Sequence, residues 1–223
     1  LDYGVSPEKI KISGMPVHPK FHEIDEIDAQ KARQAFGLDA EKFTVFVNAG
    51  WIGGGNIPQI FRELVAGELD VQAIFLAGKN EELKREAEEL AKTAKFPVKV
   101  IGYSDEIEKL MQSANVMVSK LGGLTTFEAL ACRLPIIADG TTPPMPQEAG
   151  TVKLLAQKGA GVLLEKATDI VPIIQNLLSD SKKYAAMKAA TVGMSIPNST
   201  QKIIEEIVAL LPENQTIAKQ EAA

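Results

Sequence analysis

A glycine pair and two polar side chains in the middle of the chain could bind a phosphorylated ligand. The stretch SKLGGLTTFEAL (119–130) follows a short apolar run and leads into apolar residues at helical spacing. Gly122 and Gly123 permit a tight turn and allow a ligand to approach the backbone closely. The unpaired N–H groups at the start of the following helix, with the helix dipole, favour a negative charge there. This pattern predicts a site for a phosphate or a carboxylate group.

The same stretch also fits a purely structural turn. A glycine pair is an ordinary way to pass from a strand into a helix. Thr125 and Glu128 have the Ser/Thr-x-x-Glu spacing of a capping box, in which two side chains satisfy N–H groups of the first helical turn. Considered alone, the stretch leaves both interpretations open.

The elements that must position this stretch alternate along the chain between apolar runs and amphipathic segments. Buried strands are predicted at 43–49, 71–77, 98–101, 115–118, 135–138 and 161–164. Helices are predicted at 25–36, 58–65, 81–94, 106–113, 124–132, 168–178, 184–192 and 203–211. This alternation favours an α/β fold with a doubly wound, parallel six-stranded sheet in the order 3-2-1-4-5-6.

That strand order places two glycine-rich loops side by side. The topological switch lies between the first and fourth strands, and ligands of such sheets bind there, outside the carboxyl ends of the strands. The fourth strand ends at the glycine pair, and the first ends at the loop GWIGGGN (50–56). The coincidence favours a phosphate site over a purely structural turn.

Several common site motifs are missing from the sequence. The first loop lacks the third glycine of a dinucleotide fingerprint, and no G-x-x-x-x-G-K-[ST] P-loop occurs. A Ser-His-Asp hydrolase is poorly supported, because no G-x-S-x-G is present and the two histidines, His18 and His22, lie in a proline-rich N-terminal segment. With no cysteine cluster, no metal site is predicted.

Composition narrows the class of protein further. A net charge of −5 argues against a general nucleic-acid surface, and 45% apolar residues support a substantial core. The single cysteine, Cys132, excludes an internal disulfide and is expected on the buried side of its helix. No apolar run approaches the length of a membrane span and no signal peptide opens the chain, so a cytoplasmic protein is expected.

Five segments of the chain together resemble one known protein family. They are GMPVHPKF (14–21), FLAGKN (75–80), IGYSDEIEKLMQSANVMVSK (101–120), SKLGGLTTFEALACRLPIIA (119–138) and PQEAG (146–150). The family includes the MurG-type lipid II synthase, monogalactosyldiacylglycerol synthase and processive diacylglycerol glucosyltransferases. Its members pair two Rossmann-like domains across a cleft, an architecture called GT-B. The resemblance runs in the family's order from about residue 12 to 164 and covers only the C-terminal half of those enzymes.

The resemblance assigns roles to individual residues. Glu128 matches the acidic residue that holds both ribose hydroxyls. Gly123, Leu124 and Thr125 match the turn whose N–H groups meet the diphosphate, while Gly102 and Tyr103 match the pair that flanks the uracil. The remaining nucleotide-sugar positions implied by the matching segments are Gly50, Trp51, Gly53, Gly54, Gly78, Lys120, Gly122, Gln147 and Glu148. Departures from the family pattern cluster on the sugar and phosphate side, at Trp51-Ile52, Leu121, Pro146 and Thr151.

The resemblance implies the UDP-sugar-binding domain of an inverting transferase that passes a hexose to a lipid-type acceptor. No separate cofactor is implied, and no catalytic base is assigned within this chain. The acceptor and its base are expected on a missing N-terminal domain, so the fragment alone is expected to be inactive. The parent could associate peripherally with a membrane. A UDP-sugar epimerase of the same fold and a non-catalytic nucleotide-sugar-binding module remain as alternatives.

The predicted domain organisation follows from the same comparison. The start at Leu1, in loop-like sequence, suggests a piece of a longer protein. Residues 1–22 are expected to be the connection from the missing domain, 23–195 the Rossmann-like domain, and 196–223 a C-terminal helix with a frayed tail.

Overall fold

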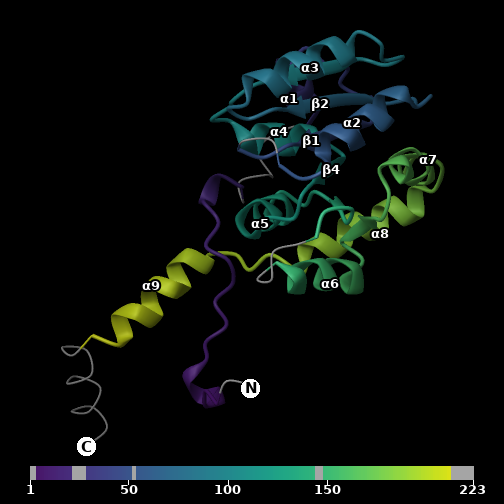
Figure 1. The fold of residues 1–223 in the computed structure, drawn as a ribbon. Coiled ribbons are helices and arrows are strands. Elements are labelled where there is room, and N and C mark those ends of the chain that lie inside the picture. Colours follow the sequence, from purple (N-terminus) through teal and green to yellow (C-terminus); the bar gives the residue numbers. More distant parts are fainter. Residues whose placement is uncertain (1–3, 22–28, 52–53, 144–147, 212–223) are drawn as a thin grey trace, which may run out of the picture.

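The computed structural model describes residues 4–21, 29–51, 54–143 and 148–211. Within these ranges, six parallel strands form one sheet in the order β3-β2-β1-β4-β5-β6, which confirms the predicted fold class and strand order (Figure 1). The strands are β1 (Thr44–Asn48), β2 (Gln72–Leu76), β3 (Val98–Ile101), β4 (Val116–Ser119), β5 (Ile136–Asp139) and β6 (Gly161–Leu164).

The described helices precede the first strand, connect consecutive strands or follow the last one. They are α1 (Ala29–Ala35), α2 (Ile57–Ala66), α3 (Glu81–Ala91), α4 (Ile107–Ser113), α5 (Gly123–Ala131), α6 (Ala149–Lys158), α7 (Ile170–Ser179), α8 (Ser181–Val192) and α9 (Ser199–Ala209). Short 3-10 turns occur at η1 (Pro7–Lys9), η2 (Pro19–Phe21) and η4 (Ala167–Asp169). The prediction missed α6. It also began α8 too late, because Asp180 caps that helix by accepting a hydrogen bond from the Lys183 N–H.

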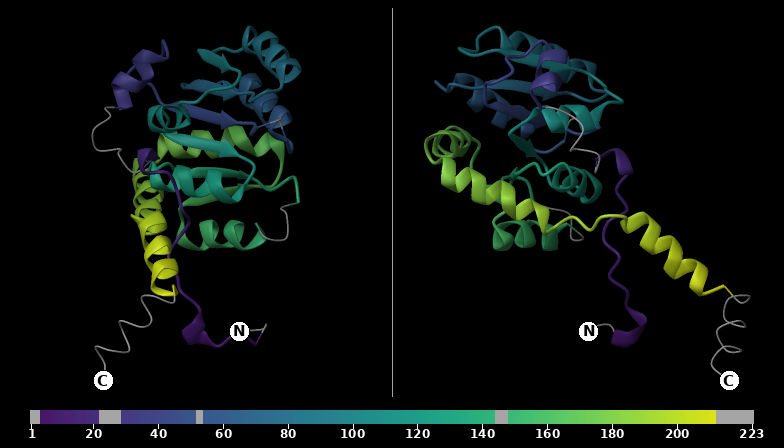
Figure 2. Two further views of the ribbon diagram at one scale, coloured as in Figure 1. Left: turned by 90° about the vertical axis from the view of Figure 1, so that its left-hand side faces the viewer. Right: turned by 180° about the vertical axis from the view of Figure 1, so that it is seen from behind.

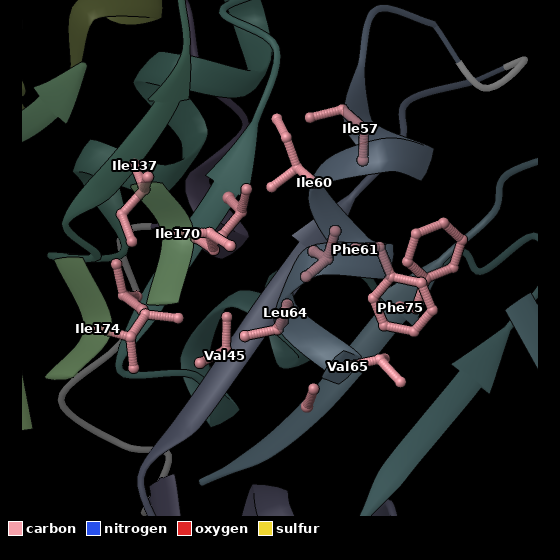
Figure 3. Packing of buried hydrophobic residues seen from close by; sticks show 14 of the residues in the cluster. Val45, Ile57, Ile60, Phe61, Leu64, Val65, Phe75, Ile137, Ile170 and Ile174 are labelled. Carbon is pink, nitrogen blue, oxygen red and sulfur yellow. The ribbon is translucent and has the colours of Figure 1, made fainter. Parts of the chain in front are cut away.

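The sheet is buried on both faces, as its continuous apolar strands predicted. Every residue of β1 and β2 is buried. On one face, β1 and β2 pack against α2, α3 and α7, and Figure 3 shows Phe75 beside Phe61 and Val45 beside Leu64. On the other face, Phe46 and Met117 pack against α4, α5 and α6. The two layers together hold the carboxyl ends of the strands rigidly in place.

The N-terminal segment and α9 leave the body of the molecule on the same side (Figure 2). The segment contacts the start of α9, because the Ser199 hydroxyl donates to the Met15 carbonyl oxygen. Gly14 has φ +86°, and a Cβ there would lie 2.8 Å from Ile196 Cβ. The segment then returns to the body, where Val17 and Phe21 are buried. None of the described helices is long and apolar enough to cross a membrane.

Candidate functional site

The glycine pair opens the start of α5 to a ligand. Gly122 is the N-cap in an extended conformation, and the helix begins at Gly123. The first helical bonds reach back to Gly122, whose carbonyl oxygen accepts from the Thr126 N–H at 3.1 Å and the Thr126 hydroxyl at 2.7 Å. The N–H groups of the first turn therefore have no partner within the helix. A Cβ placed on either glycine would meet no atom within 4 Å, so the backbone faces open space.

The capping-box interpretation of this stretch is wrong. Thr125 lies inside the first turn of α5 rather than at the N-cap, and no side chain caps the helix. Gly122 holds the N-cap position and, because it has no side chain, leaves the N–H groups of the first turn open. The side chain of Glu128 is therefore available for a different role.

A pocket of about 240 Å³ lies beside α5 at the carboxyl ends of β1, β2 and β3. Its lining residues are Asn48, Gly50, Trp51, Leu76, Gly78, Tyr103, Ser104, Ile107, Thr125 and Glu128. The structure thus gathers six of the predicted nucleotide-sugar positions, from four segments of the chain, around one space. They are Gly50, Trp51, Gly78, Tyr103, Thr125 and Glu128.

Of the other predicted positions, seven are described but do not line this pocket, and two fall outside the described residues. Gly122, Gly123 and Leu124 form the open start of α5. Gly102 follows β3, and Gly54 and Lys120 belong to the two loops at the switch. Glu148 is the N-cap of α6, where its Oε2 atom is buried with no hydrogen-bond partner among the described residues. Gly53 and Gln147 lie outside the described residues.

Glu128 is half-buried, and its surroundings influence its charge. Burial is the main cause that raises the pKa of its carboxyl group; the positive charge of Lys20 opposes the rise and the negative charge of Glu108 adds to it. Lys20 Nζ lies 2.7 Å from Glu108 Oε2, so the positive charge of Lys20 acts on both Glu108 and Glu128. An incompletely neutralised carboxylate in a pocket suits a ligand that brings hydrogen-bond donors.

The first glycine loop packs tightly against the turn after β2. Gly78 has φ +65°, and a Cβ on it would lie 2.3 Å from the Gly50 carbonyl oxygen and 2.5 Å from that of Trp51. Only glycine fits so close to another backbone in this conformation. The Lys79 N–H also donates to the Trp51 carbonyl oxygen at 2.9 Å. The two segments form one continuous wall of the pocket.

Asp139, at the end of β5, is a buried carboxylate beside Gly55 of the first glycine loop that the sequence analysis did not single out; it does not line the pocket. Its carboxylate accepts hydrogen bonds from the Asn56 N–H at 3.1 Å, the Thr141 N–H at 2.9 Å and the Thr141 and Thr142 hydroxyls at 2.6 and 2.9 Å. Burial opposes its ionisation, but these bonds together hold the pKa of Asp139 below its usual value. The sequence did contain a signal for this residue, because Asp139 directly follows the parallel strand predicted at 135–138.

Outside this pocket, the described residues give little support for a second binding site, a metal site or a reactive side chain. A hollow of about 480 Å³ between α2 and α3 includes none of the predicted site positions. No group of three His, Cys, Asp or Glu side chains in the described part of the chain could hold a metal ion. Cys132 is buried, and this burial raises the pKa of its thiol, which makes it unreactive. His18 is exposed and does not line the pocket, and His22 is not described.

A match to a protein-family model decides the family. Residues 56–192, which include the glycine pair Gly122-Gly123 and all of α5 but only the last residue of the first glycine-rich loop, match the model described as Glycosyl transferases group 1. The chain belongs to this family. The recognised resemblance to the GT-B glycosyltransferases is thereby confirmed.

Similar proteins agree with this family and show how much of a longer protein the chain resembles. It is 30% identical over 209 residues to a processive diacylglycerol β-glucosyltransferase of Bacillus licheniformis, covering 93% of this chain and 53% of that protein. The chain spans about half the length of the curated relatives it matches.

Solved structures share the fold at lower sequence identity. Acinetobacter baumannii MurG aligns with a TM-score of 0.69 at 15% identity, over 92% of this chain and 58% of that one. The Anabaena protein Alr3699/HepE in complex with UDP aligns with a TM-score of 0.65 at 19% identity, over 94% and 60%. These likenesses show one Rossmann-like half of a GT-B architecture.

Proposed function

We propose that this chain is the UDP-sugar-binding domain of an inverting glycosyltransferase. The observation that carries the proposal is the pairing of Glu128 with the open start of α5. The Glu128 carboxylate lies in the pocket, and Thr125, three residues earlier, lines the same pocket from the first helical turn. One element therefore offers an acceptor for sugar hydroxyls and N–H donors for phosphates, the two functions that a nucleotide requires together.

The ribose and the diphosphate take different parts of this site. The carboxylate of Glu128 can accept a hydrogen bond from each hydroxyl of a vicinal diol. The N–H groups of Gly123, Leu124 and Thr125 and the dipole of α5 meet the diphosphate. The donor sugar then lies toward Glu148, whose buried Oε2 atom lacks a partner among the described residues and can accept from a sugar hydroxyl. The uracil faces the turn at Gly102 and Tyr103.

The chemistry of this half is stabilisation of a leaving group. When an acceptor hydroxyl attacks the anomeric carbon, the bond to the diphosphate breaks and negative charge builds on the phosphate oxygen. Preorganised N–H donors at that position lower the barrier, because they need no reorganisation during the reaction. The acceptor and the base that deprotonates it come from a part of the parent protein beyond this chain.

The proposed acceptor is a lipid-type alcohol, and the proposed sugar is a hexose. Support comes from the relatives, which are named processive diacylglycerol β-glucosyltransferases and match nearly the whole of this chain. The Anabaena protein was also solved in complex with UDP-glucose. The parent would then work at a membrane surface, with this domain on the cytoplasmic side where nucleotide sugars are found.

Selective binding of UDP tests the proposal. Calorimetry on this chain should give tighter binding of UDP than of ADP or GDP. The backbone groups of the turn at Gly102 and Tyr103 would pair with the edge of uracil. A base with a different edge would leave those groups unpaired, typically at a cost above ~1 kcal/mol. Equal affinities for the three diphosphates would contradict the uridine assignment. Incubating the full-length parent with UDP-sugars, with and without a diacylglycerol acceptor, then separates transfer from epimerisation and from binding alone.

A further inference from the structure

We propose that Lys79, with Lys120, neutralises the phosphates of the bound nucleotide from the two ends of the first glycine loop. This inference rests on the proposed function, because it requires a nucleoside diphosphate in the pocket. Lys79 follows β2 in the turn that packs against Gly50 and Trp51. Its N–H donates to the Trp51 carbonyl oxygen at 2.9 Å, which fixes its backbone beside the pocket wall.

Two aromatic rings confine the ammonium group of Lys79. Its Nζ atom lies 4.1 Å from the ring centroid of Trp51 and 5.0 Å from that of Tyr103. The two rings contact each other edge to face, with centroids 5.6 Å apart, and both line the pocket. The Asp105 carboxylate raises the pKa of the Tyr103 phenol. The cation is therefore held against two rings of the pocket lining rather than free in solvent.

The charge of Lys79 is not balanced by a carboxylate. Among the described residues, neither Lys79 nor Lys120 has an acidic oxygen within 4.0 Å, whereas Lys20 and Lys84 each have one. Lys120 lies at the other end of the glycine loop, where its Cδ atom is 3.6 Å from the position of a Cβ on Gly55. Two uncompensated cations thus bracket the loop.

This arrangement suits a diphosphate better than a neutral ligand. A charge-assisted hydrogen bond from an ammonium group to a phosphate oxygen is stronger than an exposed cation–π contact. A phosphate that enters beside the loop therefore draws Lys79 away from the two rings. Because the rings hold the side chain near its bound position, little conformational entropy is lost in this exchange.

The test compares UDP with uridine, since only UDP carries the phosphates. Competition calorimetry would use the unaltered chain, the variants Lys79→Met and Lys79→Arg, and Lys92→Met as the control. Lys92 lies beyond the C-terminal end of α3, about 16 Å along that helix from its start, and pairs with Glu89 at the surface. We expect Lys79→Met to weaken UDP binding by about 10- to 100-fold and uridine binding less than about twofold.

Conservative replacement and salt give independent readouts. Lys79→Arg retains a cation and should recover most of the UDP affinity, while Lys92→Met should bind both ligands like the unaltered chain. The difference between the unaltered chain and Lys79→Met should shrink as salt rises from about 0.05 to 0.5 M, because salt screens exposed charges.

Three outcomes count against the inference, and they differ in meaning. Unchanged UDP affinity in Lys79→Met overturns it alone. Equal losses of UDP and uridine also overturn it, since Lys79 would then act on the nucleoside or on the shape of the pocket. No UDP binding by the unaltered chain would overturn the proposed function, and this inference with it.

Discussion

At the scale of single residues, Glu128 offers the sharpest test of ligand binding. Its carboxylate is half-buried in the pocket and takes no part in capping α5. Replacing Glu128 by Gln should weaken UDP binding by about 1.5–3 kcal/mol, the range for a hydrogen bond to a charged group. The melting temperature should be unchanged or slightly higher, because the substitution removes a charge that burial disfavours. A fall in the melting temperature with intact UDP binding would instead support a structural role.

The raised pKa of Glu128 predicts an acid limit for binding. Above that pKa the carboxylate is ionised and accepts from both ribose hydroxyls, and as the pH falls through it the group takes a proton and loses part of this capacity. UDP affinity should therefore decline on acidification at a higher pH than for an ordinary, fully exposed glutamate. Calorimetry between about pH 5 and 7 checks this. UDP affinity of the Glu128→Gln variant should still change as the phosphates of UDP take up protons. The part of the decline that comes from protonation of Glu128 should be absent.

At the scale of elements, Asp139 joins the start of α2 to the loop after β5. It accepts from Asn56, the N-cap of α2, and from Thr141 and Thr142. Asp139→Asn should lower the free energy of unfolding by about 1.5–3 kcal/mol, because the new amide N–H₂ faces donors. Since the folded pKa is depressed, this stabilisation is present above the unfolded pKa and is lost as the pH falls through the folded one.

A second aspartate provides the control for this prediction. Asp70 is an exposed residue that pairs with Lys42 at 2.9 Å. Urea denaturation of Asp70→Asn should show a change within about 0.5 kcal/mol, because exposed ion pairs contribute little. If Asp139→Asn lowered the free energy of unfolding equally little, other contacts would hold the start of α2 against the loop after β5.

The elements also show what a single sequence can reveal. The strands and their order were predictable, because β1 and β2 are continuous apolar runs and strict alternation leaves few topologies. Helix α6 was not, since Leu155 is buried while Leu154 beside it is exposed, and no clear apolar stripe develops. The Asp139 cluster depends on α2 meeting a loop more than eighty residues away. The capping-box spacing was misleading because Gly122 took the N-cap position.

At the scale of the whole molecule, we predict that this chain folds cooperatively and binds nucleotide but transfers no sugar alone. The sheet is covered on both faces by its own helices, so its core needs no partner. Transfer also requires an acceptor held in line with the donor, and loss of that positioning alone can remove roughly 7–11 kcal/mol of barrier lowering. The absence of a base would reduce the rate by a further factor of about 10² to 10⁴.

Circular dichroism melting and UDP calorimetry test the first half of this prediction, and a UDP-glucose transfer assay with diacylglycerol vesicles tests the second. The processive diacylglycerol β-glucosyltransferase of Bacillus licheniformis, assayed in parallel, serves as the positive control for the vesicles. Robust turnover by the chain alone would contradict the prediction. It would require a general base within the 223 residues. His18 is then the first described residue to replace, because it lies in the N-terminal segment two residues before Lys20, whose charge acts on Glu128.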